Sequence, residues 1–127
     1  MGTLTRSEGT APLVDIADIL SGSLPEGRKA RIRGWLSNRR SSGGIVFLII
    51  RDGTGWLQCV ARRDVVGEEG IEELEKLPVE SVLELEGSIR ADKRAPGGYE
   101  LSVDGYKVLS VSWPDYPIAK KYHGPDF

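Results

Sequence analysis

The stretch that decides the fold is residues 45–62, which read IVFLIIRDGTGWLQCVAR. It predicts two strands, over residues 45–52 and 56–61, because both runs are apolar and rich in residues that favour strands. Between them, Asp52 and Gly53 both tolerate the positive φ that tight hairpin turns need. Alternate side chains of a strand point to opposite faces, so this hairpin presents Phe47 and Gln58 on the same exposed face.

The pleat divides the rest of the hairpin into a core face and an outer face. Val46, Leu48 and Ile50 share one face of the first strand, and Leu57, Cys59 and Ala61 of the second strand suit a core. Trp56 and Val60 are left outside with Gln58. An exposed Phe47 offers a flat surface for a nucleic-acid base, and a neighbouring amide can both donate to and accept from a base edge. The alternatives are ordinary packing for Phe47 and a solvated position for Gln58.

A further strand precedes the hairpin and starts at Lys29. Its alternation puts Ile32, Gly34, Leu36 and Asn38 on one face and Arg31, Arg33, Trp35 and Ser37 on the other. Residues 41–44, Ser-Ser-Gly-Gly, are expected to break the strand, which leaves Arg39 and Arg40 at the mouth of a loop. Arg40 in this loop can donate a charge-assisted hydrogen bond to a base or phosphate. By default both arginines are solvated loop charges.

Downstream of the hairpin, residues 67–77 predict a short amphipathic helix that ends before Pro78. Two more strands follow, over residues 81–90 and 99–111, joined by a loop over residues 92–98. In the first of these strands Leu83, Leu85, Gly87 and Ile89 are expected to face inward, and Glu84, Glu86, Ser88 and Arg90 outward.

Five short antiparallel strands with a helix between the third and fourth predict an all-β OB-fold, a small five-stranded β-barrel. Such barrels bind ligands on strands two and three and on the loops that join strands one to two and four to five. A generic five-stranded barrel or an SH3-like module competes, and the helix position favours the OB-fold. The barrel is expected over residues 28–112, after a lead-in over 1–27 with a short helix at 15–20, and before a linker over 113–127.

The charges of the 127 residues nearly cancel, with 17 Lys+Arg against 19 Asp+Glu and a net charge of −2. This balance hides two opposed segments. Residues 28–63 hold nine cations and one acid, a net +8, and residues 64–86 hold nine acids and one cation, a net −8. The basic segment, which includes Arg33 and Arg51, can meet phosphates while the acids point elsewhere. Alternatively, both segments are solvated faces of a stable domain.

Composition excludes several classes of protein. One cysteine and one histidine are too few for a disulfide framework or for a Cys/His zinc site within the chain. Cys59 is expected to be a small core residue, and the sequence contains neither a phosphate-binding P-loop nor the residues of a catalytic triad, so no catalytic and no metal-ligating residues are predicted. No apolar run approaches the roughly 20 residues that span a bilayer, so we expect a cytoplasmic protein without a membrane partner.

Several motifs together resemble the N-terminal anticodon-binding domain of class II aminoacyl-tRNA synthetases of the aspartyl, asparaginyl and lysyl group. They are Gly34-Trp35-Leu36, Asn38-Arg39-Arg40, residues 43–47 (GGIVF), residues 51–55 (RDGTG) and Gln58. Residues 94–101 (RAPGGYEL), 116–118 (YPI) and 123–127 (HGPDF) look most like asparaginyl-tRNA synthetase. The resemblance covers the chain from about residue 29 onward.

This resemblance implies a module that binds tRNA of the asparagine type. The residue that matches Phe47 stacks on the middle anticodon base, a uridine, and those that match Gln58 and Arg40 hydrogen-bond that base. Lys93 and Arg94 are expected near the flanking bases. The family's catalytic domain, which uses ATP and Mg²⁺, would lie beyond residue 127, so this chain is expected to bind tRNA without a cofactor and without catalysis. The parent enzyme is expected to be a homodimer.

Three other functions stay open. The domain can belong to an aspartyl enzyme, which reads a different third anticodon base. It can be a stand-alone single-strand-binding OB protein, which would bind DNA as well as RNA. It can be an assembly module whose acidic helix or exposed barrel face docks a protein, which would bind no RNA.

Overall fold

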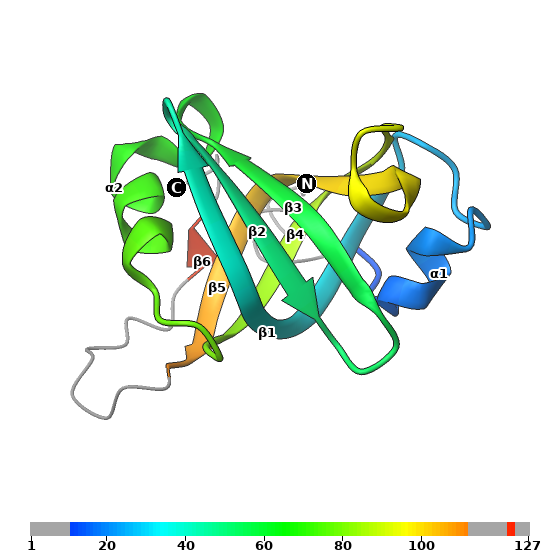
Figure 1. Ribbon diagram of the computed structural model, residues 1–127, viewed down its shortest axis with the longest axis horizontal. Coiled ribbons are helices and arrows are strands. Elements are labelled where there is room, and N and C mark those ends of the chain that lie inside the picture. The colour runs from blue at the N-terminus through cyan, green and yellow to red at the C-terminus, as the bar shows by residue number, and fades with distance from the viewer. Residues whose placement is uncertain (1–10, 112–121, 124–127) are drawn as a thin grey trace, which may run out of the picture.

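The computed structural model describes residues 11–111 and the backbone of residues 122–123. The elements, in chain order, are α1 (Ile16–Leu20), β1 (Lys29–Ser42), β2 (Ile45–Arg51), β3 (Trp56–Arg62), α2 (Arg63–Lys76), β4 (Val82–Ala91), the 3-10 helix η2 (Pro96–Gly98), β5 (Tyr99–Ser110) and β6 (Tyr122–His123) (Figure 1). Residues 1–10 of the predicted lead-in lie outside the described residues. So does the predicted linker, apart from β6, whose backbone pairs with β5.

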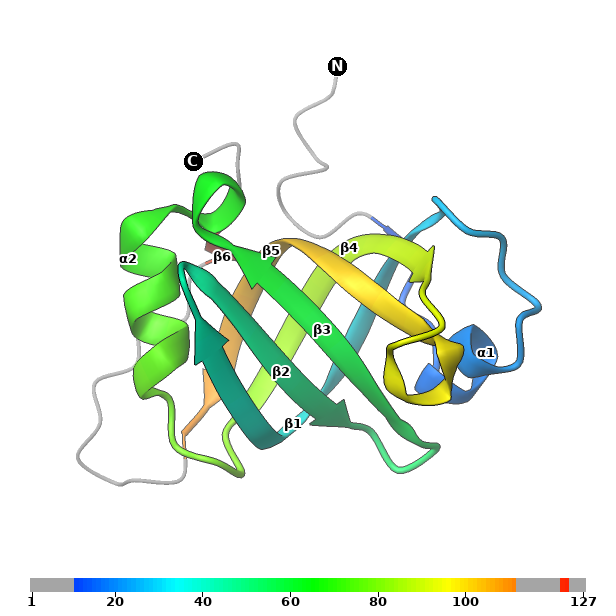
Figure 2. The same cartoon turned by 45° about the horizontal axis from the view of Figure 1, so that its top comes forward.

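The strands close into a ring, and the helices and loops are arranged around it. Antiparallel pairing gives the order β3-β2-β1-β4-β5-β6, and a parallel pairing of β3 with β5 joins the two sides. Figure 2 shows α2 at one end of the ring, and α1 at the other end beside the loop between β4 and β5. With a helix between β3 and β4, the predicted five-stranded OB-fold with a short N-terminal helix is confirmed.

The core consists of the inward faces that the alternation predicts. The buried strand residues include Val46, Leu48, Ile50, Leu57, Cys59, Ala61, Leu83, Leu85 and Ile89, all 0% exposed. Ile71 and Leu74 of α2 join the same cluster, and so do Ile16 and Ile19 of α1. Burying each such aliphatic side chain stabilises the fold by about 1.5–3 kcal/mol, so both helices are held mainly by their buried faces.

The helix α2 starts four residues earlier than predicted. It spans Arg63–Lys76, but Gly67 has non-helical backbone angles (φ 85°, ψ 166°), so a first turn is separated from the main helix. The prediction over residues 67–77 therefore found the part that carries the apolar spacing and missed the turn before it. The hydroxyl of Tyr106 on β5 donates to the carboxylate of Glu73 at 2.6 Å, which ties the main helix to the ring.

The strand β1 also differs from its prediction. Ser41 and Ser42 do not break it; they pair with Val46 and Ile45, and only residues 43–44 form the turn. Both turn residues are glycines with positive φ, 54° and 85°, the conformation that a two-residue hairpin loop requires. A register shift between Leu36 and Asn38 marks a β-bulge, which turns Asn38 to the exposed side and away from the face it was predicted to share with Leu36.

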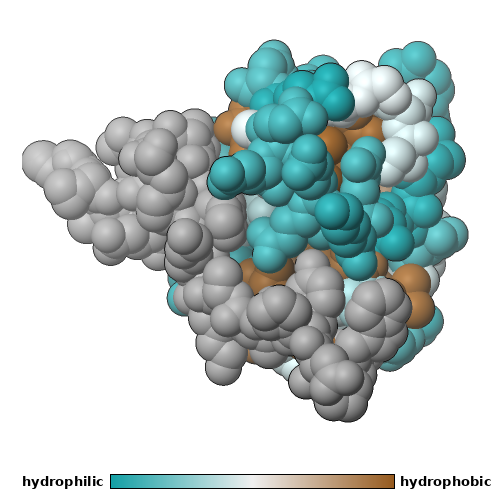
Figure 3. Space-filling model, turned by 90° about the vertical axis from the view of Figure 1, so that its left-hand side faces the viewer, coloured by the Kyte–Doolittle hydropathy of each residue, from teal (hydrophilic) through white to brown (hydrophobic). Residues whose placement is uncertain are grey.

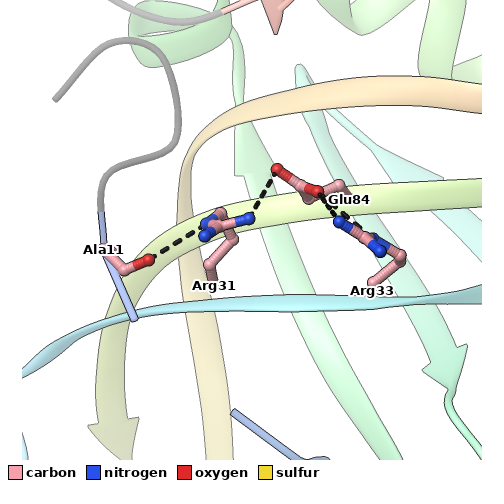
Figure 4. Close-up of polar contacts among 4 residues, drawn as sticks. All are labelled: Ala11, Arg31, Arg33 and Glu84. Carbon is pink, nitrogen blue, oxygen red and sulfur yellow. Dashed lines mark hydrogen bonds and ion pairs between the residues drawn. The ribbon is translucent and has the colours of Figure 1, made fainter. Parts of the chain in front are cut away.

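On β4, Glu84 and Glu86 alternate with the buried Leu83 and Leu85 as predicted, but each is only 6% exposed. The alternative that the acidic segment is a solvated face is therefore wrong for these two residues. The cause is the register of β1 with β4, which places Arg33 opposite Glu84 and Arg31 opposite Glu86. Glu84 accepts from Arg33 at 2.9 Å and from Arg31 at 3.2 Å, while Arg31 also donates to the carbonyl of Ala11 at 3.0 Å (Figure 4). The +8 and −8 segments of the sequence thus partly neutralise each other inside the domain.

Most acids of α2 remain at the surface. Glu68, Glu69, Glu72 and Glu75 are exposed. The side of the molecule that carries α2 is mostly hydrophilic wherever it is coloured in Figure 3. This arrangement agrees with the prediction that the acidic face of the helix is exposed to solvent.

Candidate nucleic-acid interface

The outer face of β1, β2 and β3 carries side chains whose neighbours are set by strand register. Arg40 of β1 lies opposite Phe47 of β2, which lies opposite Val60 of β3. One rung along, Gln58 lies opposite Glu100 of β5. Phe47 and Gln58 are both partly exposed. The prediction that they share the outer face is therefore confirmed.

These strands and the β4–β5 loop surround an open hollow of about 320 Å³, which we name the Phe47 pocket. It is lined by Arg40, Phe47, Gln58, Val60, Arg62, Asp92, Arg94, Ala95 and Glu100. Val60, which was predicted to lie outside, is only 2% exposed although it lines the pocket, so this prediction is wrong. An aromatic ring, an amide and arginines around one open hollow are the groups that bind an unpaired base.

Arg40 lies on β1 and not in a loop, because the strand continues to Ser42. The guanidinium carbon of Arg40 lies 4.3 Å from the centroid of the Phe47 ring. This is a cation–π contact, worth roughly 0.5–1 kcal/mol at an exposed site. The guanidinium therefore occupies one face of the ring when no ligand is bound, and a base that stacks on that face must displace it.

The amide of Gln58 has a fixed orientation. Its Nε2 donates to Oε1 of Glu100 at 3.2 Å. Glu100 is 6% exposed, and its carboxyl oxygen Oε1 is the acceptor in this hydrogen bond. The Gln58 amide therefore keeps its nitrogen toward Glu100, which leaves the amide oxygen as the acceptor offered to a ligand.

The β4–β5 loop contributes Asp92, Arg94 and Ala95 to the pocket. Oδ1 of Asp92 accepts from the backbone N–H of Arg94 at 2.9 Å and from its Nε at 3.3 Å. The backbone hydrogen bond from Arg94, followed by its side-chain bond, holds the pKa of Asp92 below its usual value. The Arg94 side chain is 92% exposed, so it is accessible to a ligand in solvent. Lys93, which was predicted beside it, is exposed but does not line the pocket.

The structure does not bring Arg39 to this pocket. Because side chains alternate along β1, Arg39 lies on the pleat opposite to Arg40. Its guanidinium donates to the backbone carbonyls of Leu77 and, at 3.4 Å, of Leu74. It thus satisfies carbonyls at the C-terminal end of α2, which the helix leaves without partners.

Arg33 and Arg51 also lie elsewhere. Arg33 belongs to the cluster around Glu84 and is already paired. Arg51 lies on the same outer face of β2 as Phe47 but lines a neighbouring hollow of about 540 Å³ together with Asn38 and Trp56. Of the eight predicted site residues, the Phe47 pocket unites Phe47, Gln58, Arg40 and Arg94.

Three polar residues of the pocket were not predicted as site residues. Arg62 follows Gln58 and Val60 at the two-residue spacing of the outer face, so alternation alone could have found it. Its guanidinium donates to the hydroxyl of Ser102 at 3.4 Å. Asp92 and Glu100 lie on either side of Arg94 in the sequence, and Glu100 reaches the pocket through the long-range pairing of β3 with β5.

Other chemistry finds little support among the described residues. Cys59 is fully buried in the core, and desolvation, followed by the nearby Glu100 carboxylate, raises the pKa of its thiol. No group of three or more His, Cys, Asp or Glu within residues 11–111 is arranged to hold a metal ion. No helix in the described part of the chain is long and apolar enough to cross a membrane.

Comparisons with known proteins identify the family of this domain. Residues 30–109 match the family described as the OB-fold nucleic acid binding domain. The asparagine–tRNA ligase of Thermus thermophilus is 47% identical over 100 residues, which cover 79% of this chain and 23% of that protein. The asparagine–tRNA ligase of Roseiflexus castenholzii is 40% identical over 116 residues, covering 91% of this chain and 26% of that protein. The chain thus spans about a quarter of the length of the curated relatives it matches.

Solved structures show the same likeness. The asparaginyl-tRNA synthetase from Pyrococcus horikoshii, complexed with asparaginyl-adenylate, superposes with a TM-score of 0.72 at 37% identity, covering 89% of this chain and 25% of that one. An aspartyl-tRNA synthetase from Entamoeba histolytica shares the fold with a TM-score of 0.72 at 20% identity, over 87% of this chain and 23% of that one. The chain therefore belongs to the family of OB-fold nucleic acid binding domains, and its curated relatives over this region are asparagine–tRNA ligases.

Proposed function

We propose that this chain is the anticodon-recognition domain of an asparaginyl-tRNA synthetase and that the Phe47 pocket holds the middle anticodon uridine. The observation that carries the proposal is the convergence of Phe47, Gln58 and Arg40 in one open pocket. Sequence-specific proteins bind single-stranded RNA loops by splaying bases onto aromatic rings and reading their Watson–Crick edges. These three side chains supply the ring and the polar groups for such a contact.

In this proposal the uracil ring stacks on Phe47 and takes the place of the Arg40 guanidinium. The displaced guanidinium lies next to the base and can donate to a carbonyl oxygen of uracil. Base–aromatic stacking is worth about 1–3 kcal/mol, which exceeds the strength of an exposed cation–π interaction between Arg40 and Phe47. The exchange is therefore favourable.

Gln58 then selects uracil over cytosine. Glu100 holds the Gln58 nitrogen, so the amide oxygen faces the ligand as an acceptor. Uracil presents an N3–H donor between two carbonyl oxygens, which complements an acceptor flanked by the Arg40 donors. Cytosine presents an unprotonated N3 at that position, and two acceptors facing each other leave both without a partner.

Arg94, and with it Lys93, is proposed to contact the bases that flank the middle position, which would include the base that separates asparagine from aspartate tRNA. The wider activity is proposed from the relatives. ATP and Mg²⁺ would serve the parent enzyme's aminoacylation outside these residues, and the enzyme would act as a cytoplasmic homodimer. This chain alone would bind tRNA and not charge it.

The test is a binding series with four anticodon stem-loop RNAs that differ only in the middle base. Phe47→Ala should weaken binding of the uridine RNA by about 1–3 kcal/mol and abolish most of the preference for uridine. Trp56→Ala is the matched control, because Trp56 is an exposed ring on the same face that does not line the Phe47 pocket. This variant should keep the preference for uridine. An equal loss for all four RNAs in Phe47→Ala would exclude specific readout and favour a general single-strand binder.

A further inference from the structure

The helix α1 lies beside the loop between β4 and β5 (Figures 1 and 2). Two of its five residues, Ile16 and Ile19, are fully buried in the core of the ring. The helix lies before residues 30–109, the part that matches the family. The helix lies next to a loop that lines the Phe47 pocket. It can therefore influence the binding site through this loop, without contacting a ligand itself.

The turn between β2 and β3 anchors the start of α1. Oδ2 of Asp52 accepts from the backbone N–H of Ile16 at 2.8 Å, and Oγ1 of Thr54 accepts from that of Ala17 at 3.0 Å. Asp15, at the N-cap position, makes no side-chain capping bond. Residues 52–55, which the sequence predicts only as a hairpin turn, thus supply the helix cap from 36 and 37 residues away.

The other end of α1 contacts the β4–β5 loop. Leu20 packs between two glycines: a Cβ on Gly97 of the loop would lie 3.0 Å from its Cδ2, and a Cβ on Gly55 of the turn would lie 3.5 Å from its Cδ1. Just after the helix, Gly22 lies against the hydroxyl of Tyr99, which a Cβ would meet at 3.0 Å. Leu20 therefore contacts both the β2–β3 turn and the β4–β5 loop.

The hydrogen bonds that shape the β4–β5 loop are local. Ala95 N–H donates to the carbonyl of Asp92 at 3.0 Å, Gly98 N–H to that of Ala95 at 2.9 Å, and Asp92 N–H to that of Gly98 at 3.0 Å. Bonds of this kind shape the loop but do not fix its position against the ring. The contacts of Gly97 and Tyr99 with the α1 segment can do so.

We propose that α1 is a brace that holds the β4–β5 loop in its pocket-lining position, with Leu20 and Thr54 as positioning residues. The brace acts on Arg94 and Asp92, which reach the Phe47 pocket from this loop. Its effect on RNA binding rests on the function proposed above, whereas its effect on the loop does not. The two parts are therefore tested with different measurements.

The first measurement is native-state amide hydrogen exchange of the loop. Leu20→Ala should speed exchange of the Arg94, Ala95 and Gly98 amides by about fivefold or more relative to central amides of β2 and β3. Leu13→Ala is the matched control, because it makes the same change in the same lead-in at a side chain that is 48% exposed. It should leave loop exchange unchanged. Leu20→Met, which keeps the volume, should restore slow exchange.

A milder variant guards against global destabilisation. Thr54→Val keeps the shape of the side chain and removes two hydrogen bonds of its hydroxyl, the one it accepts from Ala17 N–H and the one it donates to Asp52. The same loop amides should exchange faster, by a smaller factor. If both variants speed all amides equally, or leave exchange in the loop unchanged, α1 does not hold the loop and the proposal is overturned.

The second measurement is a double-mutant cycle in binding of the uridine stem-loop RNA. Leu20→Ala should weaken binding about threefold to tenfold, and Arg94→Ala should lose most of its own effect in the Leu20→Ala background, because both act through the loop. Additive effects would overturn the link between brace and pocket. Faster loop exchange in Leu20→Ala, together with a wild-type protein that binds none of the RNAs, would overturn the proposed function and leave the brace standing.

Discussion

The two halves of β1 both carry arginines and use them differently. In the first half, Arg31 and Arg33 face β4 and both bind Glu84. In the second half, Arg40 faces β2 and lies over the ring of Phe47. The bulge after Leu36 separates the halves. The side chains are chemically the same, so the strand on the other side decides whether an arginine is available to a ligand.

Removing the Glu84 carboxylate, which pairs with the arginines in the first half of β1, should have the largest effect. Glu84→Gln removes the carboxylate that pairs with both Arg31 and Arg33, at a position that is 6% exposed. Breaking a buried pair costs about 3–5 kcal/mol, and the free energy of unfolding should fall by about 2–3 kcal/mol here because Arg33 is partly solvated. Urea unfolding measures this loss. Glu75→Gln, at an exposed position of α2, is the control and should change stability by less than about 0.5 kcal/mol.

Replacing one arginine in each half of β1 by glutamine tests the comparison directly. Arg40→Gln should weaken binding of the uridine stem-loop RNA by about 1.5 kcal/mol, because it removes a charge-assisted hydrogen bond to the base. Arg33→Gln removes the same charge from the paired half and should leave affinity within about 0.5 kcal/mol. Fluorescence anisotropy titrations at one salt concentration measure both. Equal losses would mean that total positive charge, and not position, controls binding.

Replacing Asp52, whose carboxylate accepts hydrogen bonds from uncharged donors, should have the smallest effect. Burial alone raises the pKa of Asp52, but hydrogen bonds from the N–H of Ile16 and from Thr54 outweigh it and lower the pKa below 3.8. The ionised form is therefore favoured in the folded state, and its stabilisation is present above about pH 4 and lost as pH falls through the folded pKa. Asp52→Asn should be less stable than wild type at pH 7, and the difference should shrink at pH 3 in urea unfolding. A constant difference would contradict this.

The local sequence pattern was sufficient to predict which side chains are buried wherever burial depends on the geometry of a single strand or helix. Two-residue alternation places Leu48 and Leu57 in the core, and Phe47 and Gln58 outside, because the pleat is a property of each strand. Helical spacing likewise identified Ile71 and Leu74 as buried residues, because the period of a helix is also a local property of the chain. The anticodon-domain motifs also connected Arg40 with Phe47, a pair that the strand register then brings together.

What alternation could not predict depends on partners distant in sequence. The bulge after Leu36 shifts every later residue of β1, so Arg39 turns inward to α2 and Arg40 outward. Glu84 is buried because β4 pairs with the basic half of β1. Asp52 caps a helix 36 residues away. None of these contacts leaves a periodic trace in the sequence.

The parallel pairing of β3 with β5 has a consequence for the order of folding. The hairpin β2–β3 closes a short loop, whereas Gln58 and Glu100, 42 residues apart, meet only after the chain between them has been gathered. Closing longer loops carries a larger entropy cost, so we expect this seam to form after the local hairpins. Substitutions at Gln58 should then change mainly the unfolding rate. The pocket spans this seam, so a chain able to bind is a chain that has completed its folding.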